Sequence, residues 1–168
     1  MSAIYRTWDW PRDSARLADR LAAELPSELR LDFTGSSLER LEAELLRRFS
    51  DPAQLTAAEA RPFYESVCAY FGEVMVRYGG SWGWSTQWDD TDPPVVMPDE
   101  DFDLEPLSTW EVVIRAVRDR SGKEFITVWE LWDDAEIDQI DRAIEEAEDA
   151  EWDREIEEWE AEEEKDSR

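Results

Sequence analysis

The chain is organised around residues 63–84, FYESVCAYFGEVMVRYGGSWGW. The apolar residues of this stretch recur at the spacing that places side chains on one face of an α-helix, and they are Phe63, Val67, Tyr70, Phe71, Val74 and Tyr78. Gly79 and Gly80 can take the left-handed conformation that ends a helix, and Trp82-Gly83-Trp84 alternates as a strand does. We therefore expect a central buried helix over residues 62–78 that leads directly into a sheet.

Three positions within this predicted helix carry separate expectations. Gly72 lowers helix propensity by about 1 kcal/mol relative to Ala, a cost that close packing of another element would offset. Glu73 and Arg77 stand four residues apart, a spacing that favours an ion pair. Cys68 is the only cysteine, so no internal disulfide forms, and we expect its thiol to be a small buried group.

The residues before the central helix predict two helices and a strand. Apolar spacing over residues 11–25 indicates a first helix, and alternation over residues 29–33 predicts a short strand. A second helix is expected over residues 37–51. At Pro62 the sequence predicts either a kink or a new helix start, because proline disrupts a helix interior.

The residues after the central helix predict a return strand and a run of helices. Residues 95–97 are expected to pair antiparallel with the strand that follows the central helix. Ser108 and Glu111 have the spacing of a capping box, which predicts a helix over residues 108–120. Residues 125–132 fit both a helix and a strand, and we predict a helix.

These elements together predict an α-rich α+β fold, with a small antiparallel sheet packed on a central helix and a long acidic C-terminal helix. We expect one globular domain over residues 1–132, because a chain of this length can bury a substantial core. An acidic amphipathic helix is expected over residues 133–168, frayed from about Glu160.

The overall charge restricts the classes of partner. The chain has 44 acidic and 18 basic residues, a net charge of −26. A field of this sign repels nucleic acids and anionic membranes and attracts basic proteins. No apolar run is long enough to cross a membrane or to form an export signal, so we expect a cytoplasmic protein that binds neither nucleic acid directly nor membranes.

The acidic residues gather in two segments. Residues 89–105 contain eight acidic residues and no basic one, and residues 133–168 have a net charge of −15, whereas residues 1–88 carry only −3. The C-terminal segment keeps a stripe at near-helical spacing, which is Ile137, Ile140, Ile144, Ala147, Trp152, Ile156 and Trp159. This stripe is why we predict a helix there and not a disordered tail.

Catalytic and metal-binding residues are not evident in the sequence. The chain has no histidine to activate a nucleophile, and no catalytic or phosphate-binding motif, so we expect no enzyme and no cofactor. Two aspartate clusters have oxygen ligands suited to Ca²⁺ or Mg²⁺: Asp89, Asp90 and Asp92, and Asp99, Asp101 and Asp103. Neither has the glycine and the distal glutamate of an EF-hand loop, so we interpret both as solvated acidic loops.

The tryptophans divide into two groups. Those on core-like patterns are Trp82, Trp84, Trp110, Trp129 and Trp132, and those near acidic or terminal segments are Trp8, Trp10, Trp88, Trp152 and Trp159. Aromatic rings among carboxylates suit a surface that binds Lys or Arg of a basic partner, although a solubilising surface with incidental aromatics fits equally. The predicted partner-binding residues are Asp99, Asp101, Asp103, Glu105, Glu151, Trp152, Glu155, Glu158 and Trp159.

One part of the chain resembles a known group of proteins. The residues that carry the resemblance are Leu31, Asp32, Phe33, Thr34, Ser37, Leu38, Leu41, Ala69, Tyr70, Gly72, Glu73, Val74, Arg77, Gly79, Gly80, Trp82 and Trp84. They resemble a group of uncharacterised bacterial cytosolic proteins over residues 29–97. The resemblance implies a small α+β scaffold of the kind found among bacterial immunity and toxin-neutralising proteins, and it implies no catalytic residues.

Two hypotheses of function follow. In the first, the protein is an immunity protein or antitoxin whose acidic surface covers the basic active site of a toxin or nuclease, as a nucleic-acid mimic does. In the second, it is a structural or assembly factor whose C-terminal helix packs on another helix or on a second copy of the chain, forming a homodimer. A basic partner would favour the first hypothesis, and dimers without a basic ligand would favour the second.

Overall fold

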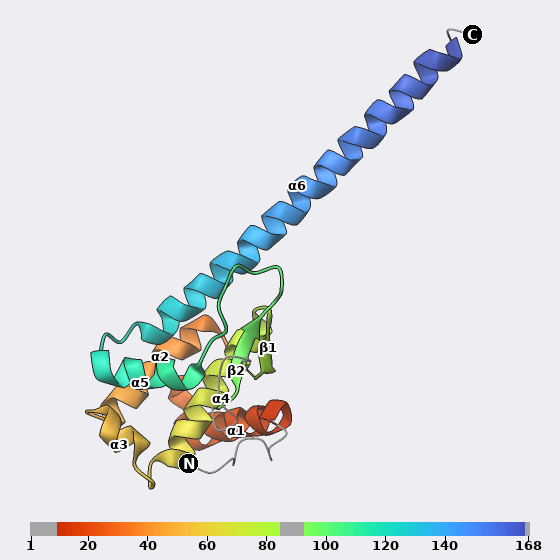
Figure 1. Ribbon diagram of the computed structural model, residues 1–168. Coiled ribbons are helices and arrows are strands. Elements are labelled where there is room, and N and C mark those ends of the chain that lie inside the picture. Colours follow the sequence, from red (N-terminus) through yellow and green to blue (C-terminus); the bar gives the residue numbers. More distant parts are fainter. Residues whose placement is uncertain (1–9, 85–92, 167–168) are drawn as a thin grey trace.

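The computed structural model describes residues 10–84 and 93–166, which form a body of helices with one small antiparallel sheet at its side (Figure 1). The elements follow in the order α1 (Trp10–Glu24), the 3-10 helix η2 (Ser27–Leu29), α2 (Gly35–Arg48), α3 (Pro52–Thr56), α4 (Arg61–Arg77), β1 (Gly80–Gly83), β2 (Val95–Pro98), α5 (Thr109–Asp119) and α6 (Glu124–Asp166). The predicted α-rich α+β fold with a long C-terminal helix is confirmed.

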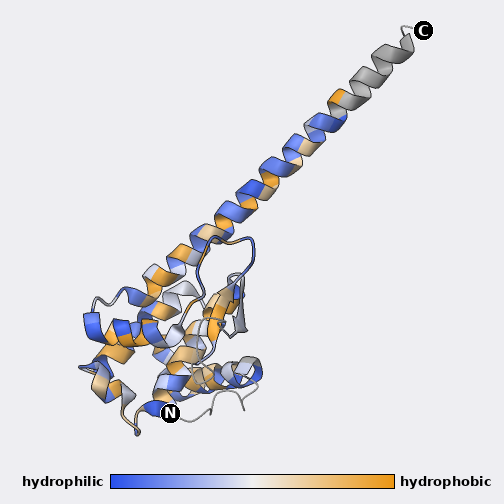
Figure 2. Ribbon diagram, in the orientation of Figure 1, coloured by the Kyte–Doolittle hydropathy of each residue, from blue (hydrophilic) through white to orange (hydrophobic). Residues whose placement is uncertain are grey.

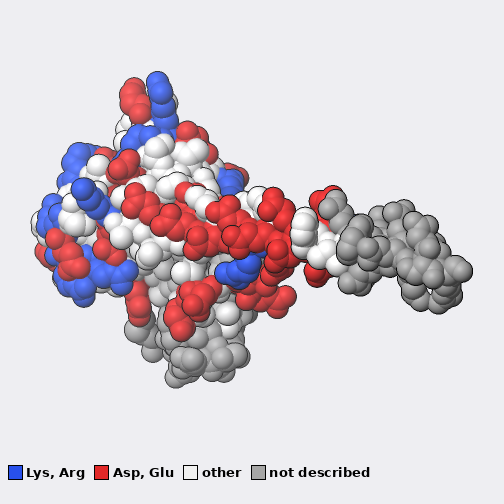
Figure 3. Space-filling model, turned by 90° about the horizontal axis from the view of Figure 1, so that it is seen from above, with Lys and Arg blue, Asp and Glu red and all other residues white. Residues whose placement is uncertain are grey.

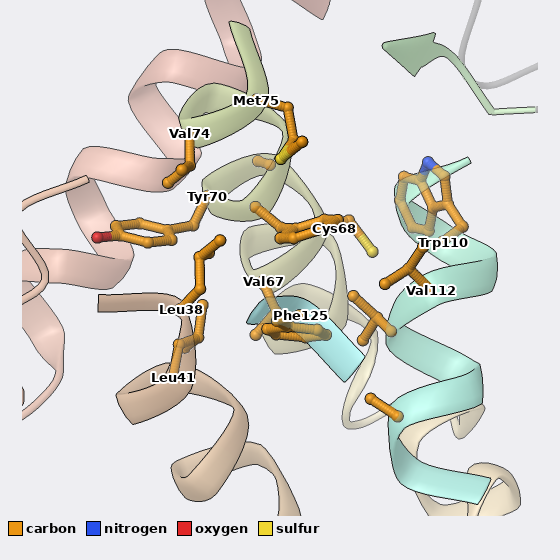
Figure 4. Packing of buried hydrophobic residues seen from close by; sticks show 14 of the residues in the cluster. Leu38, Leu41, Val67, Cys68, Tyr70, Val74, Met75, Trp110, Val112 and Phe125 are labelled. Atoms are coloured by element: carbon orange, nitrogen blue, oxygen red, sulfur yellow. The ribbon is translucent and has the colours of Figure 1, made fainter. Parts of the chain in front are cut away.

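α4 is the central element, within one residue of the predicted helix at each end. Residues 66–72 are buried without interruption, so other elements cover α4 on every side. Leu38 of α2, Val112 of α5 and Phe125 of α6 surround it (Figure 4). The ring of Phe125 stacks on Phe71 of α4 with 4.9 Å between ring centroids. The C-terminal helix therefore begins inside the core.

The sheet follows α4 directly and packs against it. β1 and β2 pair antiparallel with Trp82 opposite Val96, as predicted. The indole of Trp82 lies so close to Gly72 that a Cβ atom there would stand 2.1 Å from the ring. The predicted close approach at Gly72 is confirmed, because any side chain at this position would displace the sheet from α4.

The predicted ion pair between Glu73 and Arg77 is wrong. Oε1 of Glu73 instead accepts hydrogen bonds from Ser14 Oγ at 2.6 Å and from Trp82 Nε1 at 2.9 Å. The guanidinium of Arg77 lies over the ring of Phe33, 3.7 Å from its centroid. Glu73 thus joins α1 and the sheet to α4, and these partners outweigh a helix-surface pair worth only a few tenths of a kcal/mol.

The predicted strand at residues 29–33 is also wrong. Arg30 (φ 43°) and Phe33 (φ 62°) are left-handed, which interrupts any extended run, and the segment is a 3-10 turn followed by a loop. Side chains bind its backbone: the N–H of Phe33 donates to the Tyr70 hydroxyl at 2.8 Å, and Arg40 donates to the carbonyl of Arg30 at 2.8 Å. The alternating apolar residues anchor a loop on the core and do not face a sheet.

α1, α2 and α5 agree with the sequence analysis, whereas the short helix α3 is not among the predicted elements. α5 begins after Ser108, whose hydroxyl accepts a hydrogen bond from the N–H of Glu111 at 3.3 Å. α3 is a separate short helix capped by Asp51, so a new helix, and not a kink, begins near Pro62. Residues 125–132 are helical and form the first turns of α6, which continues unbroken to Asp166. The predicted boundary between the globular domain and the C-terminal helix, at residue 132, therefore falls within α6.

Glu42 of α2 fixes the start of α6. Its side chain is fully buried, and its carboxylate accepts hydrogen bonds from the N–H groups of Glu124 at 3.1 Å and Phe125 at 2.8 Å. Burial raises the pKa of Glu42, and the two N–H donors oppose that rise. The carboxylate thus caps the positive end of the α6 dipole from a neighbouring helix.

The C-terminal end of α2 holds a second cluster of charges. The buried carboxylate of Glu44 accepts from Nε of Arg47 at 2.7 Å and from Nε of Arg48 at 2.6 Å. Hydrogen bonds from these arginines lower the pKa of Glu44 to about 2. Arg120, in the turn between α5 and α6, donates to the carbonyl of Phe49 at 2.7 Å, which ties that turn to the end of α2.

Replacing Glu42 with Leu should lower the free energy of unfolding by about 2–4 kcal/mol, because two buried N–H groups each lose an acceptor worth about 1–3 kcal/mol. Urea denaturation measures the loss. Glu42→Gln is the control, since its amide oxygen still accepts from one N–H group and the expected loss is smaller. A Leu variant as stable as the parent would show that the cap is dispensable.

Replacing Glu44 with Gln should destabilise the fold at pH 7 by about 1 kcal/mol, a modest value because both arginines face solvent. The pKa of Glu44 is lower in the folded than in the unfolded state, so its contribution is complete above the unfolded value of 4.5 and disappears as the pH falls through about 2. Thermal melts of the parent and the variant should therefore converge between pH 5 and about 2. A constant difference across this range would contradict the assignment.

Candidate functional site

α6 has a packed part and a projecting part (Figure 1). Phe125, Val128 and Trp132 are buried in the core, and Gln139 is the last half-buried residue. From Ile140 onward every described side chain is exposed. The remaining turns, up to the end of α6, therefore extend about 40 Å from the body of the protein.

Hydrophobic residues are interspersed with hydrophilic ones along the projecting part of α6 and its base (Figure 2). Large apolar side chains among them are exposed. Their exposed fractions are 49% for Ile137, 53% for Ile140, 51% for Ile144, 64% for Trp152 and 39% for Ile156. Single exposed apolar side chains are common on folded proteins, so the distinctive feature here is that several large ones follow one another along one helix.

The acidic loop of residues 99–105 lies at the base of α6. Phe102 is buried and meets Trp132 of α6 edge-on, with 6.4 Å between ring centroids. Nε2 of Gln139 donates to Oδ2 of Asp101 at 3.2 Å, which joins the loop to the point where α6 leaves the body. The two predicted acidic segments are therefore in contact.

The predicted partner-binding residues do not form one compact patch. Asp99, Asp101, Asp103 and Glu105 are exposed on the loop, and Glu151 and Trp152 are exposed on α6. Trp152 stands about 20 Å further along the helix axis than Gln139, the contact point of the loop. The side chains of Glu155, Glu158 and Trp159 lie outside the described residues. The described residues form an elongated surface that starts at the loop and follows α6.

The grouping of the tryptophans was correct in part. Trp152 is exposed, and Trp82, Trp110, Trp129 and Trp132 belong to the core or pack against it. Trp10, predicted near the surface, is buried at 1% exposure between the rings of Trp82 and Trp110, whereas Trp84 is 42% exposed. Trp8, Trp88 and the predicted cluster of Asp89, Asp90 and Asp92 lie outside the described residues.

The acidic charge is concentrated at the base of α6. Acidic side chains gather where α6 leaves the body, whereas most Lys and Arg side chains on this face lie toward the opposite end, interspersed with acidic ones (Figure 3). Along α6, acidic residues follow at intervals of four, the spacing of neighbours on a helix surface: Asp141, Glu145, Asp149 and Asp153. This series creates a strong negative field and also repels itself.

Three other features were candidates for a functional site: Cys68, a hollow beside α1, and possible clusters of metal ligands. Cys68 is fully buried, and burial raises the pKa of its thiol well above the usual range, so it is no thiolate nucleophile. The described residues that line a hollow beside α1 all belong to that helix. They include Arg16, which pairs with Asp13, and Arg20, which pairs with Glu24. Among the described residues no acidic or cysteine cluster could hold a metal ion, and no helix suits a membrane span.

Sequence reasoning identified the apolar stripe but not which part of it is exposed. Ile137, Ile140 and Ile144 are predicted on the helix, where the assembly hypothesis uses them for helix packing, but they are not among the residues predicted to bind a basic partner. Their exposure depends on where α6 leaves the core, which Gln139 and the loop mark. The sequence feature that indicates this exposure is the change in composition after Trp132, where acidic residues flank each apolar residue.

Raising the salt concentration from about 10 mM to about 1 M should increase the helical content measured by circular dichroism, because the Debye length falls from about 30 Å to 3 Å and screens the acidic series. The variant Glu145→Lys should be more helical at low salt and respond less, since Lys would face Asp141 and Asp149. Equal salt responses of the parent and the variant would contradict the role of repulsion in this helix.

Comparison of the chain with protein-family models, with curated proteins and with solved structures found no match. The resemblance of residues 29–97 to bacterial immunity-type scaffolds therefore stays a prediction. The case for a function depends on the geometry and charge of α6 and the loop at its base.

Proposed function

We propose that the protein is a non-catalytic acidic binding protein whose helix α6 docks on a basic protein. The observation that carries this proposal is the projecting part of α6, where Ile140, Ile144 and Trp152 are each at least half exposed within a strongly acidic segment. Apolar anchors give such a surface affinity, and the surrounding carboxylates steer a cationic partner to it.

Charge favours a basic partner over a second copy of the chain. Residues 133–168 carry −15, so pairing two of these helices would bring about thirty like charges together. Like charges at helix neighbours are destabilising in either orientation of the pair. The alternative of a structural or assembly factor that dimerises through α6 is therefore the weaker hypothesis.

Within this class, we propose an immunity protein or antitoxin that neutralises a basic toxin or nuclease in the cytoplasm. Proteins that act on nucleic acids have basic active sites, because they bind a polyanion, and an acidic arm can occupy such a site. The resemblance of residues 29–97 supports the same class. The absence of histidine from the sequence and the burial of Cys68 support a role in binding and not in catalysis.

The test is to capture partners with the full-length protein, purify a captured protein and measure its binding kinetics. We expect a partner with a pI above about 9 whose toxicity on expression is suppressed by co-expression of this chain. Replacing Glu145, Glu146 and Glu148 with Gln should slow association by about tenfold at low salt, because the steering field weakens. Replacing Trp152 with Ala should speed dissociation by about tenfold, because an anchor is lost.

The matched control replaces Glu28, Glu39 and Glu59 with Gln, which removes the same charge from exposed positions that do not belong to the projecting part of α6. This variant should bind nearly as the parent does. A partner that binds the α6 variants and the parent equally, or an acidic partner, would contradict the proposal. Concentration-dependent dimers that lose their stability with Ile144→Ser, in the absence of any basic partner, would support the assembly hypothesis instead.

A further inference from the structure

We propose that α6 occupies a basic cleft that is shaped for a single strand of nucleic acid and not for a duplex. The inference rests on the proposed function, since it names the kind of site that the basic partner presents. It is carried by three properties of α6: the spacing of its charges, its width, and the directions in which its apolar side chains point.

The charge spacing of α6 matches one nucleic-acid strand. From Asp133 to Asp166 the helix has 19 acidic and three basic residues, a net charge of −16 over 34 residues. At 1.5 Å per residue these span about 51 Å, which gives one net negative charge per about 3.2 Å. Along the helix axis, one stacked strand carries one phosphate per about 3.4 Å, whereas the two strands of a duplex together carry one per about 1.7 Å. The helix is therefore about half as densely charged as a duplex.

The width of α6 also fits a cleft for a single strand better than a cleft for a duplex. A helix with its side chains is about 10–12 Å across, narrow enough to enter the major groove of DNA and hence much narrower than a duplex. Beyond Ile140 every described side chain of α6 is exposed, so no second element of the described chain thickens it. A cleft wide enough for a duplex would leave one side of the helix without contacts, and a narrower cleft would enclose it.

The apolar side chains point to more than one side of the helix. At 100° per residue, Trp152 is rotated by about 80° from Ile144 and by about 120° from Ile140. A flat partner surface can contact side chains on one side of the helix only, whereas a cleft that surrounds the helix can contact Trp152 and the two isoleucines together. Clefts for single strands also contain aromatic side chains on which bases stack, and the 64% exposed indole of Trp152 can stack in the same way.

The test is competition between nucleic acids and the full-length protein for the purified basic partner. The probes are a 15-nucleotide oligothymidylate, which carries about as many charges as the charged part of α6, and a 15-base-pair duplex. We expect the oligothymidylate to displace the protein at an about tenfold lower phosphate concentration than the duplex does. Displacement by the duplex at equal or lower concentration, or by neither probe, would overturn the inference and leave the proposed function intact.

A second measurement examines Trp152. If the indole stacks on an aromatic surface, Trp152→Phe should bind within about threefold of the parent and Trp152→Leu about tenfold more weakly, because Leu is apolar but cannot stack. The control is Trp84→Leu, because Trp84 is an exposed tryptophan that follows β1 and lies outside α6. This variant should bind as the parent does. Equal affinities of the Phe and Leu variants would overturn the stacking contact. If no basic partner binds, the proposed function fails together with this inference.

Discussion

A reciprocal exchange of charged side chains between α2 and the start of α6 determines how the long helix is placed. Glu42 of α2 accepts from the first N–H groups of α6, and Arg120, just before α6, donates to carbonyls at the end of α2. Each side chain satisfies helix-terminal groups that would otherwise lack partners. Phe125 then packs on Phe71 and Trp129 packs over Gly35, so the first turns cannot rotate without losing core contacts. The direction of the projecting part is thereby set within the core.

Much of the fold follows from local patterns in the sequence. The apolar face of residues 62–78 marks the central helix, the glycines after it mark its end, and Gly72 correctly indicates a close approach, here by Trp82. These features are predictable because each depends on residues near in sequence. The C-terminal helix is predictable for the same reason, since its apolar stripe keeps a helical period among the acidic residues.

The errors occur where distant residues decide the conformation. Residues 29–33 alternate as a strand does, but the hydroxyl of Tyr70 and the guanidinium of Arg40 bind their backbone in a left-handed turn. Nothing local shows that Glu42 is buried and not on the exposed face of its helix, because its partners lie more than eighty residues away. For the candidate site, the residue types were predictable, whereas the elongated arrangement required knowing where α6 leaves the core.

The side chains on the projecting helix bear on the choice between the proposed docking role and simple solubilisation. An arm that served only solubility would use acidic residues and helix-forming polar residues throughout. Here Ile140, Ile144 and Trp152 are exposed. Burying such a side chain is favourable by about 1.5–3 kcal/mol, and the free protein does not gain this stabilisation. Because α6 is fixed at its base, it presents these side chains with less ordering cost on binding than a flexible acidic tail would incur. The combination of a fixed base, apolar anchors and a uniform acidic field favours one elongated basic site as the surface that covers them.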